Sequence, residues 1–333
     1  MADGTAAEYD VLGIGNAIVD VIAQSGEDFL AAHDLPKGSM TLIDSAQADA
    51  LYDRMGPGVE VSGGSVANSV AGIASLGGRA AYIGKVRDDE LGRIFAHDIR
   101  AAGVAFATAA ADEGPGTARC LILVTPDAQR TMSTYLGACT GLGPDDVDGA
   151  LVAASAVTYL EGYLWDPPRA KAAFRVAMDA AHAAGRRVAL SLSDAFCVER
   201  HRHEFQELIE GSVDVLFANR DEIIALYESD DLESAVAAVR GRCEVAVVTR
   251  SEEGSLVVTA DAVHEVPAEP VARPVDTTGA GDLFAAGFLH GLTNGAPLAD
   301  CARLGAVAAA EVISHYGARP ETRLRDLVAS IRA

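Results

Sequence analysis

Two kinds of hydrophobic pattern alternate along most of the chain. Short apolar runs typical of buried strands are followed by Ala-rich stretches whose apolar positions recur every three or four residues, as in amphipathic helices. The strand candidates are residues 9–15, 157–160, 187–192, 213–217 and 244–249. The helix candidates are residues 65–76, 89–101, 167–184, 219–227, 232–240, 279–292 and 298–315. This alternation predicts an α/β fold of three layers, a central mostly parallel sheet flanked by helices on both faces.

Two segments depart from this rhythm. Residues 35–44 and 117–136 alternate polar and apolar positions like strands, and Pro126-Asp127 predicts a hairpin turn within the second. Strands added outside an α/β rhythm predict a small second sheet, and such appendages often act as lids. We find no linker-like composition and no internal repeat. We therefore expect residues 1–333 to form a single domain, with a lid from about 35–44 and 106–138 and a large α/β part from the remainder.

Charge and composition limit the classes of partner. The 333 residues are 50% hydrophobic and carry a formal net charge of −22. Such an acidic chain repels phosphate backbones, so nucleic acid and anionic membranes are excluded as expected partners. The start of the chain has no basic segment followed by an apolar one, and the five scattered cysteines form no CxxC, which favours a reducing, cytoplasmic location. A phosphate site would have to rely on backbone N–H groups, helix N-termini and a metal ion.

The most informative segment is DTTGAGD, residues 276–282, which leads directly into a strongly helical stretch. Gly279, Ala280 and Gly281 are small, so N–H groups at the start of the helix can approach a ligand and form an anion hole. Asp282 falls in the first turn, where its carboxylate can accept the proton of an attacking hydroxyl. The alternative is an ordinary capped helix in which Asp282 merely favours the dipole; the length of the string favours the phosphate site.

Two earlier segments are candidates for an acceptor site. Gly63 and Gly64 precede a helix and let a ligand approach the backbone, and Asn68 lies one turn beyond them. The alternative is a Gly-Gly turn with Ser65 as helix N-cap. Asp20 has apolar neighbours on both sides and needs hydrogen-bonding partners; its carboxylate suits a cis-diol. The alternative is a surface carboxylate at the end of a strand.

DTTGAGD is similar to the C-terminal signature of the ribokinase-like (PfkB) carbohydrate kinase family, and motifs from residue 13 to residue 317 fall in the family's order. The resemblance implies a ribokinase-like fold with a β lid, ATP as phosphoryl donor, Asp282 as catalytic base and Gly279–Gly281 as anion hole. Gly15-Asn16 with Asp20, and Gly63-Gly64-Ser65 with Asn68, resemble adenosine kinases more than ribokinases, which typically carry Lys where Ser65 stands. By this resemblance Asp20, Gly64 and Asn68 hold ribose hydroxyls, and Asn16 lies near the base or the ribose.

The resemblance also implies residues on the nucleotide side. Asn219 and Glu222 match the family's Asn-x-x-Glu element, in which the Glu organises Mg²⁺ through water and the Asn faces the phosphates; a plain helix N-cap is the alternative. Thr249 and Gly254 match the loop that covers ATP, and Arg250 is a candidate phosphate contact. Some members bind a monovalent cation such as K⁺ beside the anion hole, where Asp276 and Thr278 match. Arg130 is expected either to move onto the phosphates on lid closure or to remain an exposed hairpin residue.

The nucleobase site is less defined by the sequence. Met40, Tyr135, Tyr163 and Trp165 are candidates for an apolar wall over a purine, with lid and core packing as the alternative for each. The resulting hypothesis is a kinase that phosphorylates the 5′-hydroxyl of a ribonucleoside, adenosine to AMP, acting as a monomer or homodimer. The alternatives are a sugar kinase acting on ribose, fructose or a related sugar, and a catalytically inactive nucleoside-binding protein.

Overall fold

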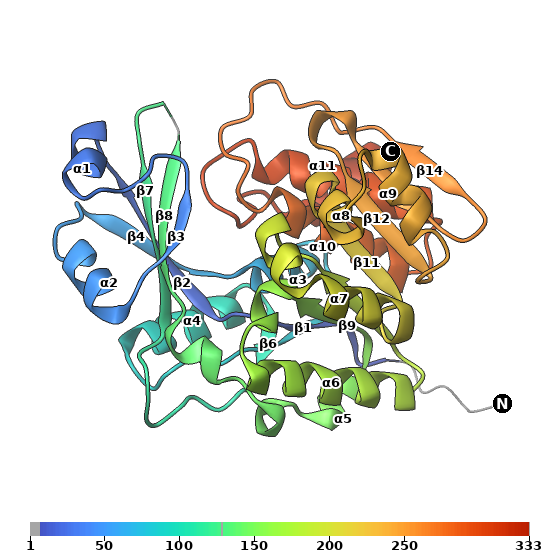
Figure 1. Ribbon diagram of the computed structural model, residues 1–333, viewed down its shortest axis with the longest axis horizontal. Helices are drawn as coiled ribbons and strands as arrows, with labels where there is room; N and C mark the ends of the chain where they lie inside the picture. Colours follow the sequence, from blue (N-terminus) through green and yellow to red (C-terminus); the bar gives the residue numbers. More distant parts are fainter. Residues whose placement is uncertain (1–6, 128, 333) are drawn as a thin grey trace.

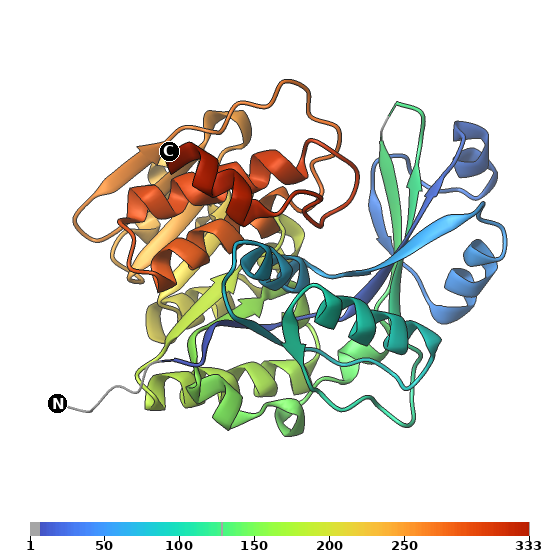
Figure 2. The same cartoon turned by 180° about the vertical axis from the view of Figure 1, so that it is seen from behind.

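A large sheet forms the centre of the molecule (Figures 1 and 2). The computed structural model describes residues 7–127 and 129–332. The strand order is β14-β13-β12-β11-β10-β9-β1-β5-β6; the strands from β12 to β6 run parallel, and β13 and β14 extend the sheet as an antiparallel hairpin. These strands are β1 (Tyr9–Ile14), β5 (Ala80–Ile83), β6 (Val104–Phe106), β9 (Ser155–Glu161), β10 (Arg187–Ser191), β11 (Val215–Asn219), β12 (Val245–Thr249), β13 (Ser255–Val258) and β14 (Val263–Val266).

Helices cover both faces of this sheet because alternate residues of its strands are apolar on both sides. In β1, Val11 packs in one core and Leu12 and Ile14 pack in the other. The Val11 side is covered by α3 (Ser65–Ser75), α4 (Glu90–Ala101), α10 (Ala280–Thr293), α11 (Leu298–Val312) and α12 (Leu324–Arg332). The opposite side is covered by α5 (Gly149–Ala153), α6 (Pro168–Ala183), α7 (Ala195–Gly211), α8 (Arg220–Tyr227) and α9 (Leu232–Val239).

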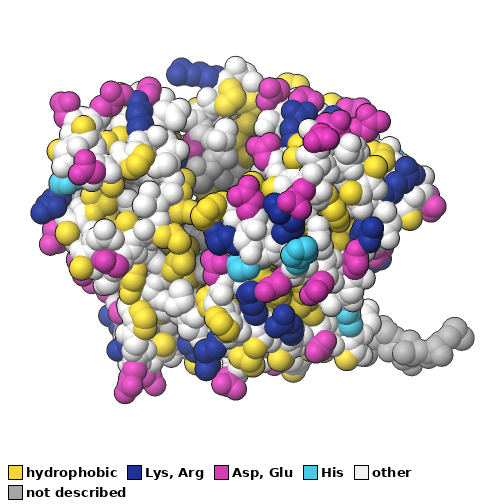
Figure 3. Space-filling model, viewed as in Figure 1, with side chains coloured by type: hydrophobic (Ala, Val, Ile, Leu, Met, Phe, Trp, Pro, Cys, Tyr) yellow, Lys and Arg dark blue, Asp and Glu magenta, His cyan; other side chains and the backbone are white. Residues whose placement is uncertain are grey.

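A second, smaller sheet stands to one side of the first (Figure 1). Its order is β3-β8-β7-β2-β4, formed by β2 (Ile18–Gln24), β3 (Met40–Leu42), β4 (Gly58–Gly63), β7 (Ala118–Val124) and β8 (Arg130–Tyr135). Val21 and Leu121 pack under α1 (Glu27–Ala32) and α2 (Ser45–Tyr52) on its outer face. The opposite, inner face carries Ile22, Ile122 and Met132. Figure 3 shows a hollow between the part of the molecule on the left, which holds the small sheet, and the rest.

The large and small sheets and the flanking helices confirm the predicted three-layer α/β fold. The small sheet differs in extent from the predicted lid, because β2 and β4 belong to it and lie outside 35–44 and 106–138. The strand β6, which overlaps the second range only at Phe106, belongs to the large sheet. The hairpin at Pro126-Asp127 joins β7 to β8 as predicted, with residue 128 outside the described residues. In the part of the chain that the structure describes, no helix is long and apolar enough to cross a bilayer.

Candidate active site

The amino end of α10 forms the centre of the site. Gly279 caps the helix with φ +79°, a conformation that favours glycine, and Gly281 is exposed with open space where a side chain would be. Asp282 follows in the first turn. Its Oδ1 accepts a hydrogen bond from Ser65 Oγ at 2.6 Å and its Oδ2 accepts one from Asn68 Nδ2 at 2.9 Å. The helix end is therefore open, and its acid is fixed against the start of α3.

The start of α3 is shaped by the glycine pair before it. Gly64 caps the helix with φ +98°, and a Cβ there would overlap the carbonyl oxygen of Asn16. Ser65 makes no capping bond, because its hydroxyl donates to Asp282 instead. The N-cap alternative for Ser65 is therefore wrong. Asn68 is buried, and within the described residues its Oδ1 has no hydrogen-bond partner, so this oxygen can accept a hydroxyl from a ligand.

Asp20 enters the same site from the small sheet. It is the third residue of β2, opposite Val61 of β4 and Cys120 of β7. A Cβ on Gly63 would overlap the Asp20 carboxylate, so the glycine is required for the carboxylate to lie where it does. Asp20 is therefore not a surface carboxylate at the end of a strand, which was the alternative.

The two half-buried acids, Asp20 and Asp282, have perturbed electrostatics. Burial raises the pKa of Asp282 to about 6, against the lowering effect of the Ser65 and Asn68 hydrogen bonds and of Arg319. Burial raises the pKa of Asp20 to about 7, with Asp282 adding to the rise and Arg319 and Arg130 opposing it. Partly desolvated acids that titrate near neutrality are typical of catalytic groups.

These pKa values predict opposite responses of activity and stability to pH. A general base must be ionised, so kcat/KM for the acceptor is expected to rise with pH through about 6–7 and then level off. Since both folded-state pKa values lie above those of the unfolded chain, the associated stability is present in acid and is lost as pH rises through the same window. Initial rates and melting temperatures across about pH 5–9 test both trends; a rate that is flat between pH 5 and 8 would contradict the first.

Glu161 is a residue of this site that the sequence analysis missed. It ends β9, is fully buried, and accepts hydrogen bonds from Asn16 Nδ2 at 2.7 Å and from the N–H of Val66 at 3.1 Å. Burial raises the pKa of Glu161 to about 7. The available sequence signal is a carboxylate at the carboxyl end of a buried parallel strand, where ligands bind in open α/β sheets. Glu161 orients the Asn16 amide and holds the amino end of α3.

The nucleotide-side candidates lie along the same edge of the large sheet. Asn219 ends β11 and Thr249 ends β12, and the two are paired in register. Asn219 and Glu222 form a capping box at the start of α8, with Glu222 N donating to Asn219 Oδ1 and Asn219 Nδ2 donating to Glu222 Oε1. Asn219 is therefore the N-cap of α8, as the alternative interpretation expected. Burial, followed by the nearby Asp194 and Asp221, raises the pKa of Glu222 to about 7.

An ion pair joins the small sheet to the DTTGAGD loop. Arg130 of β8 pairs with Asp276, and both side chains are buried. Asp276 also accepts the N–H groups of Thr278 at 3.1 Å and Gly317 at 2.9 Å. Among the described residues, Arg130 Nε and Nη1 have no hydrogen-bond partner. Arg130 is thus not an exposed hairpin residue but a cation with free donors beside the open end of α10.

Four candidates lie elsewhere or are occupied. Thr134 lies on the same face of the small sheet as Cys120 and Asp20, and its hydroxyl contacts the Cys120 sulfur. Tyr135 is the next residue of β8, so its side chain points to the opposite face. Trp165 is fully buried in the core, as its packing alternative stated. Arg250 is engaged with Glu265 and with the carbonyl of Glu253 in its own hairpin. Met40 lies on the edge strand β3, 44% exposed.

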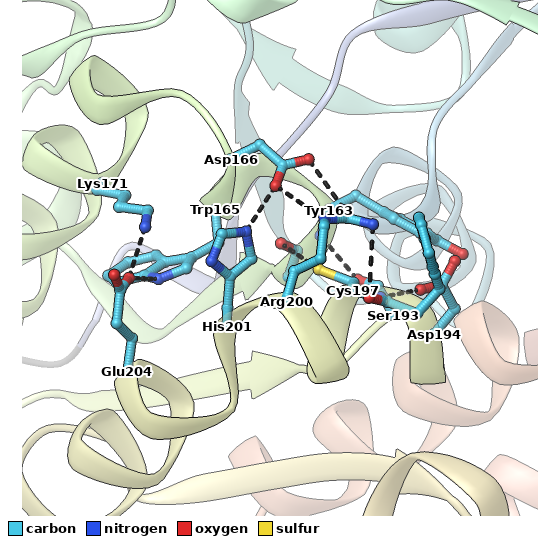
Figure 4. Close-up of polar contacts among 12 residues, drawn as sticks. Tyr163, Trp165, Asp166, Lys171, Ser193, Asp194, Cys197, Arg200, His201 and Glu204 are labelled. Carbon is cyan, nitrogen blue, oxygen red and sulfur yellow. Dashed lines mark hydrogen bonds and ion pairs between the residues drawn. The ribbon is translucent and has the colours of Figure 1, made fainter. Parts of the chain in front are cut away.

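Polar contacts tie the loop after β9 to the segment that begins α7 (Figure 4). The N–H of Tyr163 donates to Ser193 Oγ at 3.0 Å, and Asp194 caps α7 by accepting the N–H of Cys197 at 2.6 Å. Ser193 has φ +75°, a strained conformation for a residue with a side chain. Further contacts join Asp166 to Arg200 and His201, and Glu204 to Trp165 and Lys171. Burial, followed by the charges of Asp194, Glu222 and Asp282, raises the pKa of Tyr163.

Comparison with known proteins identifies the family. The model of pfkB family carbohydrate kinases matches residues 41–323. This chain belongs to the pfkB family. Kinases of the family transfer a phosphoryl group to a hydroxyl of a sugar or nucleoside, so the protein is a phosphotransferase with an alcohol group as acceptor. The resemblance drawn from DTTGAGD is thereby confirmed.

Individual relatives divide between two kinds of acceptor. The crystal structure of adenosine kinase from Sinorhizobium meliloti is 55% identical, with a TM-score of 0.92 over 98% of this chain and 100% of that chain. A probable sugar kinase from Rhizobium etli is 49% identical, with a TM-score of 0.93 over 98% and 99% of the two chains. An uncharacterized sugar kinase from Archaeoglobus fulgidus is 31% identical over 74% of this chain and 96% of its own length. The acceptor within the pfkB family is therefore a separate question.

Proposed function

We propose that the protein transfers the γ-phosphoryl group of ATP to the 5′-hydroxyl of a ribonucleoside, with adenosine converted to AMP. The observation that carries this is the Asp282 carboxylate, fixed by Ser65 and Asn68 at the open amino end of α10. The likeness to the adenosine kinase of Sinorhizobium meliloti supports the choice of nucleoside.

The acceptor is held by groups from both parts of the molecule. Asp20 accepts hydrogen bonds from the ribose diol, and the free Asn68 Oδ1 accepts a further hydroxyl. Asn16, oriented by Glu161, lies on the same side. The backbone of Gly63 and Gly64 allows the ribose to approach closely.

Transfer then needs little covalent chemistry from the protein. Asp282 accepts the proton of the 5′-hydroxyl as the acceptor oxygen forms its bond to phosphorus and the bond from phosphorus to the ADP oxygen breaks. The N–H groups of Gly279, Ala280 and Gly281 and the dipole of α10 stabilise negative charge on the transferring group. The small sheet, closed over the ribose, excludes water and limits hydrolysis of ATP.

The donor side fits a nucleotide with magnesium. Arg130 offers Nε and Nη1 to a phosphate, and Asn219, Thr249, Gly254 and Thr278 lie on the proposed nucleotide side. Glu222, with Asp194 and Asp221 nearby, supplies negative charge for the waters of a magnesium ion. Bound Mg²⁺ supplies charge neutralisation at the phosphates.

Several finer assignments stay predictions. Arg250 as a phosphate contact requires its guanidinium to leave Glu265. A K⁺ ion beside Asp276 and Thr278 stays a prediction, since Arg130 already pairs with that carboxylate. The oligomeric state, monomer or homodimer, and a cytoplasmic location also stay predictions, as does a base-binding role for Tyr135.

A kinase panel tests the proposed acceptor. Purified protein with ATP and Mg²⁺ is assayed with adenosine, inosine, guanosine, ribose and fructose, and AMP and ADP are quantified by chromatography. We expect kcat/KM for adenosine to exceed that of either free sugar by at least about 100-fold, since a bound base contributes apolar contact area that a sugar lacks. A free sugar turned over far better than every nucleoside would contradict the proposal.

A sugar kinase is the second candidate, supported by the sugar-kinase relatives from Rhizobium etli and Archaeoglobus fulgidus. The same Asp20 and Asp282 would serve a free sugar, and only the space above the ribose distinguishes the two. Absence of turnover with every acceptor, together with a thermal shift caused by a nucleoside, would instead favour an inactive binding protein.

A further inference from the structure

The segment between α11 and α12 passes directly behind the proposed acceptor site. We call residues 313–323 the tail loop. Its Gly317 N–H donates to Asp276 Oδ2 at 2.9 Å and its Thr322 N–H donates to the buried Glu311 Oε1 at 2.7 Å. Ala318 packs against Gly279, where an added Cβ would lie 2.8 Å from the Ala318 Cβ. The tail loop is thus tied to the anion hole on one side.

Arg319 of the tail loop reaches from there to the acceptor turn. Its Nε donates to the carbonyl of Ser62 at 3.1 Å and its Nη2 donates to Ser62 Oγ at 2.8 Å. Its Nη1 donates to the carbonyl of Ala67 at 2.8 Å. Ser62 is in β4 of the small sheet and Ala67 is in α3, so one planar guanidinium joins the two ends of the turn that carries Gly63 and Gly64. The N–H of Ser62 is held separately by Asp98 of α4 at 2.8 Å.

The two residues that Arg319 holds adjoin the acids of the site: Ser62 precedes Gly63, against which the Asp20 carboxylate lies, and Ala67 precedes Asn68, which donates to Asp282. Arg319 lowers the pKa of both Asp20 and Asp282, against the larger effect of burial. None of its three hydrogen bonds goes to either carboxylate, so the charge acts through space. The other ionisable groups around the two acids are Asp98 of α4, Tyr82 of β5, Cys120 of β7, Tyr159 and Glu161 of β9, Tyr163 after β9 and Arg130 of β8. Only Arg130 and Arg319 in this described group are cations, and Arg130 is already paired with Asp276.

We propose that Arg319 is a positioning residue of the acceptor site, which holds the turn from Ser62 to Ala67 in place and supplies a fixed positive charge next to Asp20 and Asp282. This rests on the proposed function, in which those two carboxylates bind and deprotonate the acceptor. It also gives the tail loop a role in the acceptor half of the reaction, although the loop contacts the anion hole.

Two substitutions separate the charge from the geometry. R319Q removes the charge, and the acid limb of the kcat/KM profile is expected to move up by about one pH unit because a compensating cation is lost. R319K keeps the positive charge but loses the forked guanidinium group. The acid limb of the kcat/KM profile is therefore expected to stay in place. The acceptor KM is expected to rise about 10-fold or more, because Lys replaces fixed contacts to Ser62 and Ala67 with a single mobile one. The acceptor is whichever compound the kinase panel shows to be best.

R202Q is the matched control. Arg202 of α7 also donates to a carbonyl, that of Ala225 at 2.8 Å, and pairs with Glu228, both on the far face of the large sheet. R202Q is expected to lower the melting temperature without moving the acid limb. An R319Q enzyme whose kcat/KM falls by the same factor at every pH, as for a structural residue, would overturn the proposal.

A second measurement needs no activity and therefore separates this proposal from the proposed function. The melting-temperature deficit of R319Q relative to the wild-type protein is expected to grow from about pH 5 to pH 8, because the buried carboxylates ionise without their cation. A deficit that is constant over this range overturns the electrostatic role even if no acceptor has been found. If R319Q does not fold, R319K decides: an unchanged limb with a raised KM supports the proposal, and an unchanged KM contradicts it.

Discussion

Replacement of Asp282 by Asn is expected to lower kcat by about 10²–10⁴-fold, the usual contribution of a positioned general base. The amide keeps the shape of the carboxylate between Ser65 and Asn68 but cannot accept the hydroxyl proton. The acceptor KM is expected to change much less, because the diol is bound by other groups. Steady-state rates at about pH 8, where the wild-type acid is ionised, measure the loss.

D300N is the control for this variant. Asp300 occupies the first turn of α11 as Asp282 does in α10, and its carboxylate forms an exposed ion pair with Arg303. Its replacement removes the same favourable interaction with a helix dipole, worth about 0.3–1 kcal/mol, without touching the site. D300N should therefore retain activity within about twofold, since the dipole interaction it loses is remote from the chemistry. Undiminished turnover in D282N would remove Asp282 from its role as base.

Replacement of Asp20 by Asn is expected to raise the acceptor KM by about 10–100-fold, since hydrogen bonds to a charged group are worth about 1.5–3 kcal/mol. The effect on kcat should be smaller, because Asp20 is proposed to bind the diol and not to transfer a proton. The assay belongs near pH 8, above the pKa of about 7 for this carboxyl. A substrate that lacks the ribose hydroxyl bound by Asp20 should lose the same interaction. D20N is therefore expected to lose much of the wild-type preference for adenosine over 2′- or 3′-deoxyadenosine.

D10N is the control for this variant. Asp10 accepts bonds from the Arg79 N–H at 2.8 Å and its guanidinium at 2.9 Å, near the amino end of β1 and so at the sheet edge away from the site. Its loss should lower stability slightly and leave the acceptor KM unchanged. An unaltered preference for adenosine over its deoxy analogues in D20N would show that Asp20 does not contact the diol.

The helices that the sequence predicted well are those whose periodicity is uninterrupted. Residues 65–76 and 279–292 correspond within a residue to α3 and α10, because small and apolar side chains repeat along each. The helix α7 is not among the predicted helices, because its sequence is polar. Within it, His201 has non-helical backbone angles, so the helix is kinked at that residue. The strand β2 is not among the predicted strands: it begins four residues after β1 ends, where the chain passes from the large sheet to the small one.

Residues of the candidate site divide in the same way. The sequence predicted Asp282, Gly64 and Asn68 as site residues, because each lies in a short motif that contains glycines. Glu161 and Arg319 carry no such string, because their partners Asn16 and Ser62 are 145 and 257 residues away in sequence. Nothing in a local pattern reports such pairings. For Asn219 and Glu222 the sequence could not separate capping from ion binding, and the observed capping box leaves the carboxylate in place for either.

The proposed diol ligand and the proposed base belong to different bodies of the molecule. Asp20 is on a strand of the small sheet, whereas Asp282 is on a helix packed against the large one. Recognition and chemistry can therefore diverge separately: substitutions around Asp20 on the small sheet can change which alcohol is admitted while Asp282 and the start of α10 stay constant. A scaffold divided in this way allows sugar-specific and nucleoside-specific enzymes to descend from one ancestor without rebuilding the catalytic end.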